Sequence, residues 1–132
     1  MSYTICYFSN STIPLEKKAL EQLFTTTVHN NTQLDITGIL LYESGNFFQI
    51  LEGDKEALKT LYTKIKIDDR HNSIFIILDK KIEKRTFAEY KSGFSIVQNS
   101  EDLNNVERYL EASKNSLPDS EIILGLLKPF LM

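Results

Sequence analysis

Tyr7 is the first residue whose side chain could do more than fill a core. It lies in the aromatic and β-branched segment 3–9, which predicts a buried strand, and it shares a strand face with Ile5. A buried phenol requires a hydrogen-bond partner. That partner could be a backbone carbonyl, as in an ordinary core tyrosine, or a polar group of a functional site.

Gln49 is the most informative polar residue, because it interrupts the apolar segment 46–51. Strand alternation puts it on one face with Phe47 and Leu51. Its amide has two donor hydrogens and one acceptor oxygen, which need partners if the side chain is buried. Tyr7 or a polar ligand could supply them. The alternative is an edge strand that exposes Gln49 to water.

Asn31 precedes the second predicted strand, and Gly38 lies near its start. The pair Asn30-Asn31 ends the first predicted helix, where asparagine is typical of a C-terminal cap. Gly38 lies inside the strand, which indicates close approach by a ligand, by backbone or by a bulky side chain.

Asp68, Arg70 and His71 follow the second predicted helix, and Lys64 precedes them by one turn. Such a cluster is typical of a solvated turn. It could also hold an anionic or hydroxyl-bearing ligand near the end of the helix, since its positive groups are compatible with a phosphate or diphosphate.

The motifs of common enzyme classes do not occur in the sequence. There is no Ser-His-Asp order, Gly-rich phosphate loop, His-x-x-x-His pair or pair of cysteines. Glu52 and Asp54 stand at a strand-to-helix turn, where capping of the helix explains them best. One cysteine and two histidines argue against a structural zinc site, so we expect neither an enzyme nor a metal site.

Hydrophobic periodicity predicts the elements that position these residues. The pattern indicates helices from Pro14 to Asn30 and from Asp54 to Asp68, and strands at residues 3–9, 36–42, 47–51, 73–78 and 93–97. The order β-α-β-β-α-β-β is the ferredoxin-like α+β pattern, with both helices on one face of the sheet. Residues 73–78 are almost wholly apolar, so we expect that strand to be central.

The last third of the chain predicts two further helices. Ser100 and Asp102 can cap the first, and Ser116-Leu117-Pro118 breaks it. Residues 121–131 are strongly apolar but too few to span a membrane. This second helix therefore packs on the free face of the sheet or against a partner subunit.

Composition limits the class of protein. The chain has 132 residues, of which 42% are hydrophobic and 25% charged, as expected for one globular domain. A net charge of −3 gives no electrostatic reason to bind nucleic acid. The N-terminus lacks the pattern of a secretory signal, and no apolar run has the length of a membrane span, so we expect a cytoplasmic protein without membrane contact.

Taken in order, these segments resemble the BLUF family of flavin-based blue-light sensors, whose fold is ferredoxin-like with two C-terminal helices. Each motif is short, but their order and spacing extend over about three quarters of the chain. The matching segments are residues 3–9, Asn30-Asn31, Asp35-Ile36-Thr37-Gly38, Gly45 with Phe47-Phe48-Gln49-Ile50-Leu51-Glu52-Gly53, Leu61-Tyr62, Asp68-Asp69-Arg70-His71, Arg85-x-Phe87 and Gly93-Phe94.

The resemblance implies a role for each candidate residue. Tyr7 resembles the redox-active tyrosine of the family, and Gln49 the glutamine between that tyrosine and the flavin. In the family, blue light drives electron and proton transfer from the tyrosine, and the glutamine rearranges to give a red-shifted signalling state. The resemblance also implies a flavin site, for FAD or FMN, made of further residues. Asn31, Asp68, Arg70 and His71 belong to its polar parts, together with Lys64. The apolar walls are Leu40, Phe47 and Ile65.

One departure from the family concerns signal transmission. Family members usually carry Trp-x-Met near the fifth strand, whereas this chain has Tyr90-Lys91-Ser92 and no tryptophan at all.

We expect residues 1–97 to form the flavin domain and residues 98–132 a helical extension, with output through an unknown protein partner or a homo-oligomer. The alternative is a ferredoxin-like interaction or small-molecule-sensing module without photochemistry.

Overall fold

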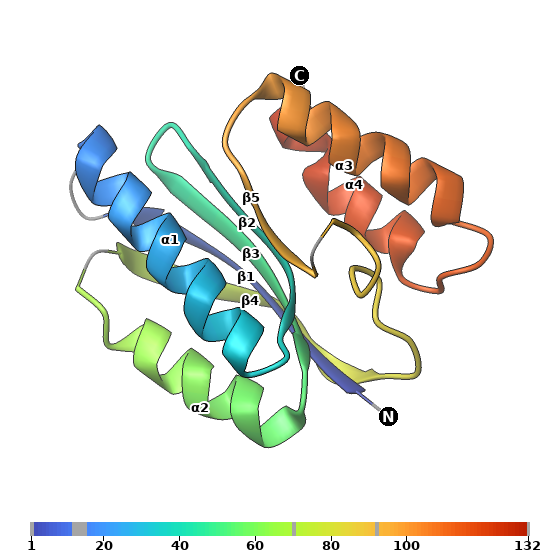
Figure 1. The fold of residues 1–132 in the computed structure, drawn as a ribbon, viewed down its shortest axis with the longest axis horizontal. Helices are drawn as coiled ribbons and strands as arrows, with labels where there is room; N and C mark the ends of the chain where they lie inside the picture. The colour runs from blue at the N-terminus through green and yellow to red at the C-terminus, as the bar shows by residue number, and fades with distance from the viewer. Residues whose placement is uncertain (1, 12–15, 70, 92, 132) are drawn as a thin grey trace.

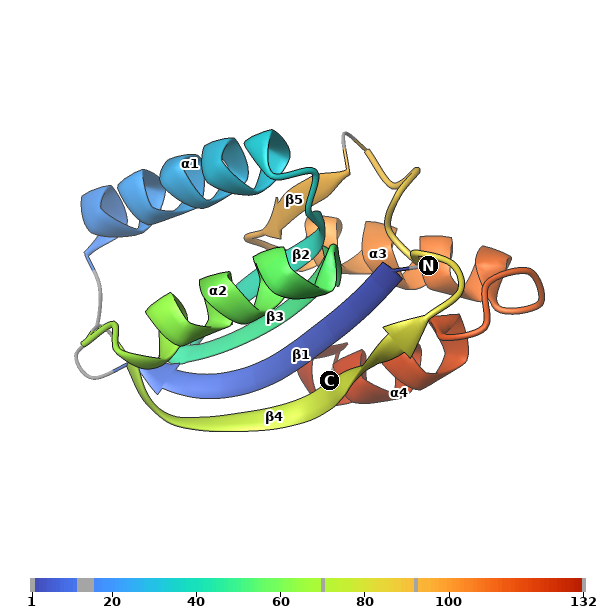
Figure 2. The ribbon, with the colours of Figure 1, turned by 90° about the horizontal axis from the view of Figure 1, so that it is seen from below.

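The computed structural model describes residues 2–11, 16–69, 71–91 and 93–131, and shows three layers built on one mixed sheet (Figure 1). Helices α1 and α2 cover one face, and helices α3 and α4 cover the other (Figure 2). The elements are β1 (Ser2–Ser11), α1 (Lys17–Gln33), β2 (Thr37–Glu43), β3 (Asn46–Gly53), α2 (Lys55–Lys66), β4 (His71–Ile82), β5 (Phe94–Val97), α3 (Ser100–Ser113) and α4 (Ser120–Leu131).

The strands are ordered β4-β1-β3-β2-β5. Strand β1 pairs antiparallel with both β3 and β4, β2 pairs antiparallel with β3, and β5 joins β2 in parallel. This topology, with two helices after the sheet, confirms the ferredoxin-like α+β prediction.

Strand alternation divides the apolar side chains between two cores, one on each face of the sheet. On the α1/α2 face, Ile5, Phe47 and Leu51 pack with residues of both helices. On the other face, Phe48 and Ile50 pack with α3 and α4. The predicted split of the third strand into two apolar faces is therefore confirmed. For the apolar last helix, the sequence left the sheet or a partner subunit open, and in the structure the helix packs on the sheet.

Helix α1 does not end where the sequence predicted. It continues past Asn30 and Asn31 to Gln33, and the backbone N–H of Leu34 bonds the Asn30 carbonyl at 3.2 Å. Asn31 is buried within the last turn instead of capping it. The predicted start at Pro14 lies outside the described residues, and the described helix begins at Lys17.

Capping was predicted correctly for α2 and incorrectly for α3. The Asp54 carboxylate accepts the Ala57 N–H at 3.1 Å, as expected for an N-cap, but Glu52 does not cap this helix. The cap of α3 is Asn99, whose side chain accepts the Asp102 N–H at 2.8 Å. Asp102 in turn accepts the Gln98 N–H, so it contributes to the turn without being the cap.

The apolar strand β4 lies at an edge of the sheet, so the predicted central position is wrong. Phe75 is 65% exposed, and Ile76 and Ile77 are also exposed. The pairing of β4 with β1 shifts register twice, and Ser73 has a positive φ of 50° beside one of these shifts. Apolar composition could not reveal strand order, because order depends on which strands pair over long distances in the chain.

Gly38 occupies a position in β2 where any Cβ would collide with the backbone of β3. Its φ is +140°, and a Cβ at this position would overlap the Ile50 carbonyl oxygen. Of the three causes that the sequence left open, close approach of backbone is the one found.

We expect Gly38→Ala to lower the free energy of unfolding by at least about 2 kcal/mol, through steric overlap and backbone strain. Gly125→Ala is the matched control, because Gly125 lies in α4 and a Cβ added there would meet no atom within 4 Å. That substitution should stabilise the protein by about 0.5–1 kcal/mol. Denaturant unfolding of both variants measures the contrast, and equal effects would contradict it.

Candidate functional site

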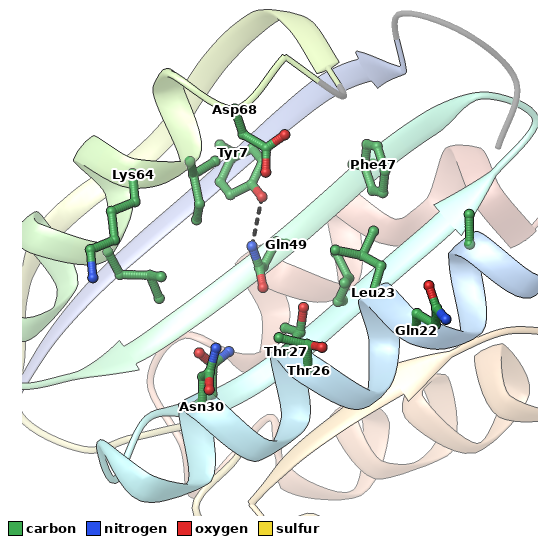
Figure 3. A pocket seen from close by; sticks show the side chains of 15 residues that line it. Tyr7, Gln22, Leu23, Thr26, Thr27, Asn30, Phe47, Gln49, Lys64 and Asp68 are labelled. Carbon is green, nitrogen blue, oxygen red and sulfur yellow. Dashed lines mark hydrogen bonds between the residues drawn. The ribbon is translucent and has the colours of Figure 1, made fainter.

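Tyr7 and Gln49 lie directly opposite each other on the paired strands β1 and β3. The Gln49 Nε2 donates a hydrogen bond to the Tyr7 hydroxyl at 2.6 Å, and both side chains are buried, with 3% and 4% exposure (Figure 3). Strand β3 is the middle strand of the sheet, so the edge-strand explanation of Gln49 is wrong. The pair forms the floor of a site on the α1/α2 face.

A cavity of about 480 Å³ lies over this pair, between α1 and α2. Its volume is in the usual range for small-molecule pockets, about 300–1,000 Å³. Thr26 and Thr27 of α1 lie beside Gln49, whereas the amine of Lys64 on α2 points away from it (Figure 3). The residues that line the cavity are Tyr7, Ala19, Gln22, Leu23, Thr26, Thr27, Asn30, Asn31, Leu40, Phe47, Gln49, Leu61, Lys64, Ile65 and Asp68.

Most of the predicted site residues meet in this cavity. Besides Tyr7 and Gln49, its lining includes six of them: Asn31, Leu40, Phe47, Lys64, Ile65 and Asp68.

Four predicted residues lie elsewhere or cannot be placed. Arg70 and Ser92 are outside the described residues. His71 begins β4, and its side chain is likewise outside the description. Tyr90 precedes β5 and is buried on the opposite face of the sheet, in the core with α3 and α4.

Two buried polar atoms that line the cavity have no hydrogen-bond partner among the described residues. They are Nδ2 of Asn31, a donor, and Oε1 of Gln49, an acceptor. Buried polar groups are normally paired, because an unpaired one costs about 1–3 kcal/mol. A ligand that offers both an acceptor and a donor along one edge would satisfy both atoms.

The surroundings of Tyr7 keep its hydroxyl protonated. Burial raises the pKa of Tyr7 well above its ordinary value, and the hydrogen bond from Gln49 lowers it by less. Tyr62, whose ring centroid is 6.0 Å from that of Tyr7, and Asp68 raise this pKa further. The group is therefore a neutral phenol that retains its proton at physiological pH.

The sequence prediction missed the inner face of α1. Gln22, Thr26, Thr27 and Asn30 all line the cavity, together with the apolar Ala19 and Leu23. Their spacing of three and four residues is a helical face, and its polar members were the available signal. A helix that turns hydroxyls and amides towards a sheet is typical of a wall of a binding site.

A family model described as "BLUF: Sensors of blue-light using FAD" matches residues 2–93. The chain belongs to the BLUF family. This BLUF domain is thus of the class that senses blue light with a flavin, and the predicted family is confirmed.

The chain is similar to part of a larger protein and to several solved structures. It is 39% identical to the photoactivated adenylate cyclase subunit beta of Euglena longa over 64% of this chain and 10% of that protein. Among solved structures, the BLUF protein BlrB in its dark state has a TM-score of 0.70 at 27% identity, covering 92% of this chain and 89% of that one. Klebsiella pneumoniae BlrP1 with FMN and cyclic diGMP has a TM-score of 0.66 at 33% identity, covering 74% and 26%.

The cyclase match has a consequence for function. This chain spans about a tenth of the length of that cyclase subunit, so the similarity is limited to a small part of that protein. In the described part of this chain, no helix combines the length and apolar character needed to cross a lipid bilayer.

The cavity fits a flavin. The pyrimidine edge of an isoalloxazine carries carbonyl oxygens and one N–H, which complement the unpaired Asn31 Nδ2 and Gln49 Oε1. The apolar side chains of Leu40, Phe47 and Ile65 supply walls for a planar ring system.

We expect Tyr7 to resist ionisation in an alkaline titration. Tyrosinate absorbance of the wild type minus that of Tyr7→Phe should show no contribution from Tyr7 at or below pH 10, because its pKa is raised. The unfolded chain would ionise this phenol first, so Tyr7 costs stability as the pH rises above about 10. Extra tyrosinate in the folded wild type below that pH would contradict the placement of Tyr7.

Proposed function

We propose that Tyr7 and Gln49 are the photoactive pair of this BLUF domain, with Tyr7 as the light-driven electron and proton donor. The observation that carries the proposal is the 2.6 Å hydrogen bond between them, together with the unpartnered Gln49 Oε1 at the cavity. No other tyrosine lines the cavity in the described part of the chain.

Tyr7 is suited to a reversible one-electron step. A bound oxidised flavin supplies an acceptor that absorbs blue light and is strongly oxidising when excited. Tyr7 would give one electron and its hydroxyl proton to that acceptor and would regain both when they return, so that no covalent product remains. Its raised pKa keeps the phenol protonated beforehand, so the hydroxyl proton is present to follow the electron.

Gln49 supplies the change that outlasts this step. Its amide has a donor end and an acceptor end of nearly the same shape, so rotation by half a turn exchanges them. In the orientation of the structure, Nε2 donates to Tyr7 and Oε1 is directed away from it. In the reversed orientation, the Tyr7 hydroxyl donates to Oε1, and Nε2 becomes a donor towards the ligand.

Other residues of the cavity hold the flavin in this proposal. Asn31 bonds the pyrimidine edge, Leu40, Phe47 and Ile65 pack against the ring, and Asp68 lines the polar part. Lys64 lines the cavity as a cation and provides the charge for a phosphate of FAD, the flavin we propose. Arg70 and His71 contribute to the same polar part.

Residues 1–97 form the flavin domain in this proposal, and residues 98–132 form an extension that carries the signal onward. Because α3 and α4 pack on the face of the sheet opposite the cavity, a change at Gln49 has to cross the sheet to reach them. The domain then acts as a cytoplasmic sensor and not as an enzyme, through a protein partner or a homo-oligomer.

Tyr7→Phe should abolish the reversible red shift of flavin absorbance under blue light while leaving bound flavin in place, since only one hydroxyl is removed. Absorbance spectra in darkness and after illumination measure this. Tyr42→Phe is the matched control, because this half-buried tyrosine packs on Phe47 and does not line the cavity. An unchanged shift in Tyr7→Phe would refute the proposed role of Tyr7.

Asn31→Ala should weaken flavin binding by about tenfold, the usual effect of losing one buried hydrogen bond of about 1–1.5 kcal/mol. Quenching of flavin fluorescence, with FAD and FMN titrated separately, gives the dissociation constants. Asn30→Ala is the comparison, because Asn30 also lines the cavity but is exposed, so its loss should matter less. Wild-type affinity in Asn31→Ala would exclude Asn31 as a flavin ligand.

A further inference from the structure

Glu52 is a buried carboxylate that joins three segments of the chain. It is 1% exposed and lies on β3, three residues beyond Gln49. Its Oε1 accepts the Thr37 hydroxyl of β2 at 2.9 Å and the Phe87 N–H at 2.9 Å, and its Oε2 accepts the Thr86 N–H at 2.6 Å. Glu52 therefore ties the strand of the photoactive pair to the connection between β4 and β5.

The same connection is bonded from its other side by helix α3. The Tyr109 hydroxyl donates to the Thr86 carbonyl oxygen at 2.6 Å. The peptide unit between Thr86 and Phe87 is thus held at both ends, its N–H by Glu52 and its C=O by Tyr109. A peptide unit is planar and rigid, so its two ends move together.

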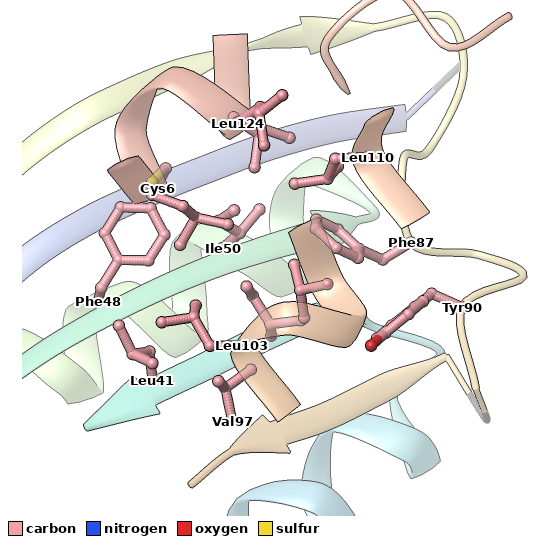
Figure 4. Close-up of a cluster of buried hydrophobic side chains, with 14 residues drawn as sticks. Cys6, Leu41, Phe48, Ile50, Phe87, Tyr90, Val97, Leu103, Leu110 and Leu124 are labelled. Carbon is pink, nitrogen blue, oxygen red and sulfur yellow. The ribbon is translucent and has the colours of Figure 1, made fainter. Parts of the chain in front are cut away.

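Aromatic contacts surround this peptide. The ring centroids of Tyr90 and Tyr109 are 4.7 Å apart, and Phe87 lies 6.0 Å from Tyr90 and 6.2 Å from Tyr109. Phe87 and Tyr90 belong to the β4–β5 connection, and their rings are part of the core under α3 and α4 (Figure 4). The buried hydroxyl of Tyr90 has no partner among the described residues, so Tyr90 contributes its ring but no side-chain hydrogen bond here.

We propose that the Thr86–Phe87 peptide, held between Glu52 and Tyr109, couples the strand of the photoactive pair to helix α3. Glu52 and Tyr109 are positioning residues in this role, because neither lines the flavin cavity. The inference rests on the proposed function of Tyr7 and Gln49.

The path is short and consists of rigid parts. Glu52 lies three residue steps beyond Gln49, roughly 10 Å along β3. A displacement of β3 at Glu52 pulls on the Phe87 N–H, tilts the peptide plane and changes the geometry at the Tyr109 hydroxyl. The change acts directly on helix α3, since Tyr109 is one of its residues.

The test compares hydrogen–deuterium exchange of α3 amides in darkness and under blue light in flavin-loaded protein. In the wild type, light should change the exchange rates of α3. Tyr109→Phe keeps the ring and removes the hydroxyl, and it should remove most of this light-induced change, because the hydrogen bond that joins α3 to the peptide is lost. The red shift of the flavin should be unaffected.

Two further variants make the result specific. Glu52→Gln disturbs the other end of the same peptide and should give the same loss, which keeps the test decisive if one variant folds poorly. Tyr3→Phe is the matched control, because it removes a tyrosine hydroxyl that bonds Asp79 at the other side of the sheet. Its α3 response should equal that of the wild type.

The outcomes separate this proposal from the one on which it rests. A wild-type α3 response in both Tyr109→Phe and Glu52→Gln would overturn the coupling and leave the photoactive pair intact. Absence of any red shift in the wild type would overturn the proposed function and the coupling with it. Loss of the α3 response with a preserved red shift would support both.

Discussion

The antiparallel register between β1 and β3 is the constraint on which the site depends. Tyr7 and Gln49 are 42 residues apart in the chain, yet they form a buried hydrogen bond because this register sets them opposite each other. Since strand side chains alternate with a period of two, a slip of one residue would turn Gln49 to the other face and away from Tyr7. The neighbouring pairing of β2 with β3 requires glycine at position 38, because a Cβ there would overlap the Ile50 carbonyl oxygen.

The sheet separates two environments with different tasks. One face presents a cavity in which polar atoms remain unpaired, and the other is an apolar core sealed by α3 and α4. A single strand, β3, contributes to both, through Gln49 on one side and Phe48 and Ile50 on the other. A change in hydrogen bonding at the cavity therefore has a physical route to the helices on the opposite face.

Sequence reasoning succeeded where the signal was local or periodic. Alternation along β3 predicted which residues share a face with Gln49, and the capping preference of aspartate predicted the start of α2 at Asp54. It failed where the outcome depends on distant partners. Asn31 was interpreted as a helix end because its burial comes from the cavity, and β4 was expected to be central because apolar residues do not encode strand order. Glu52 was assigned to a cap because its three donors come from β2 and the β4–β5 connection.

The edge strand β4 exposes Phe75, Ile76 and Ile77 along a free edge of the sheet. Regular apolar edges are templates on which further chains can add strand by strand and grow into fibrils. The two register shifts in β4 interrupt the even spacing that such growth requires. The irregular edge of β4 is therefore a poorer template for the addition of further strands than a regular apolar edge would be.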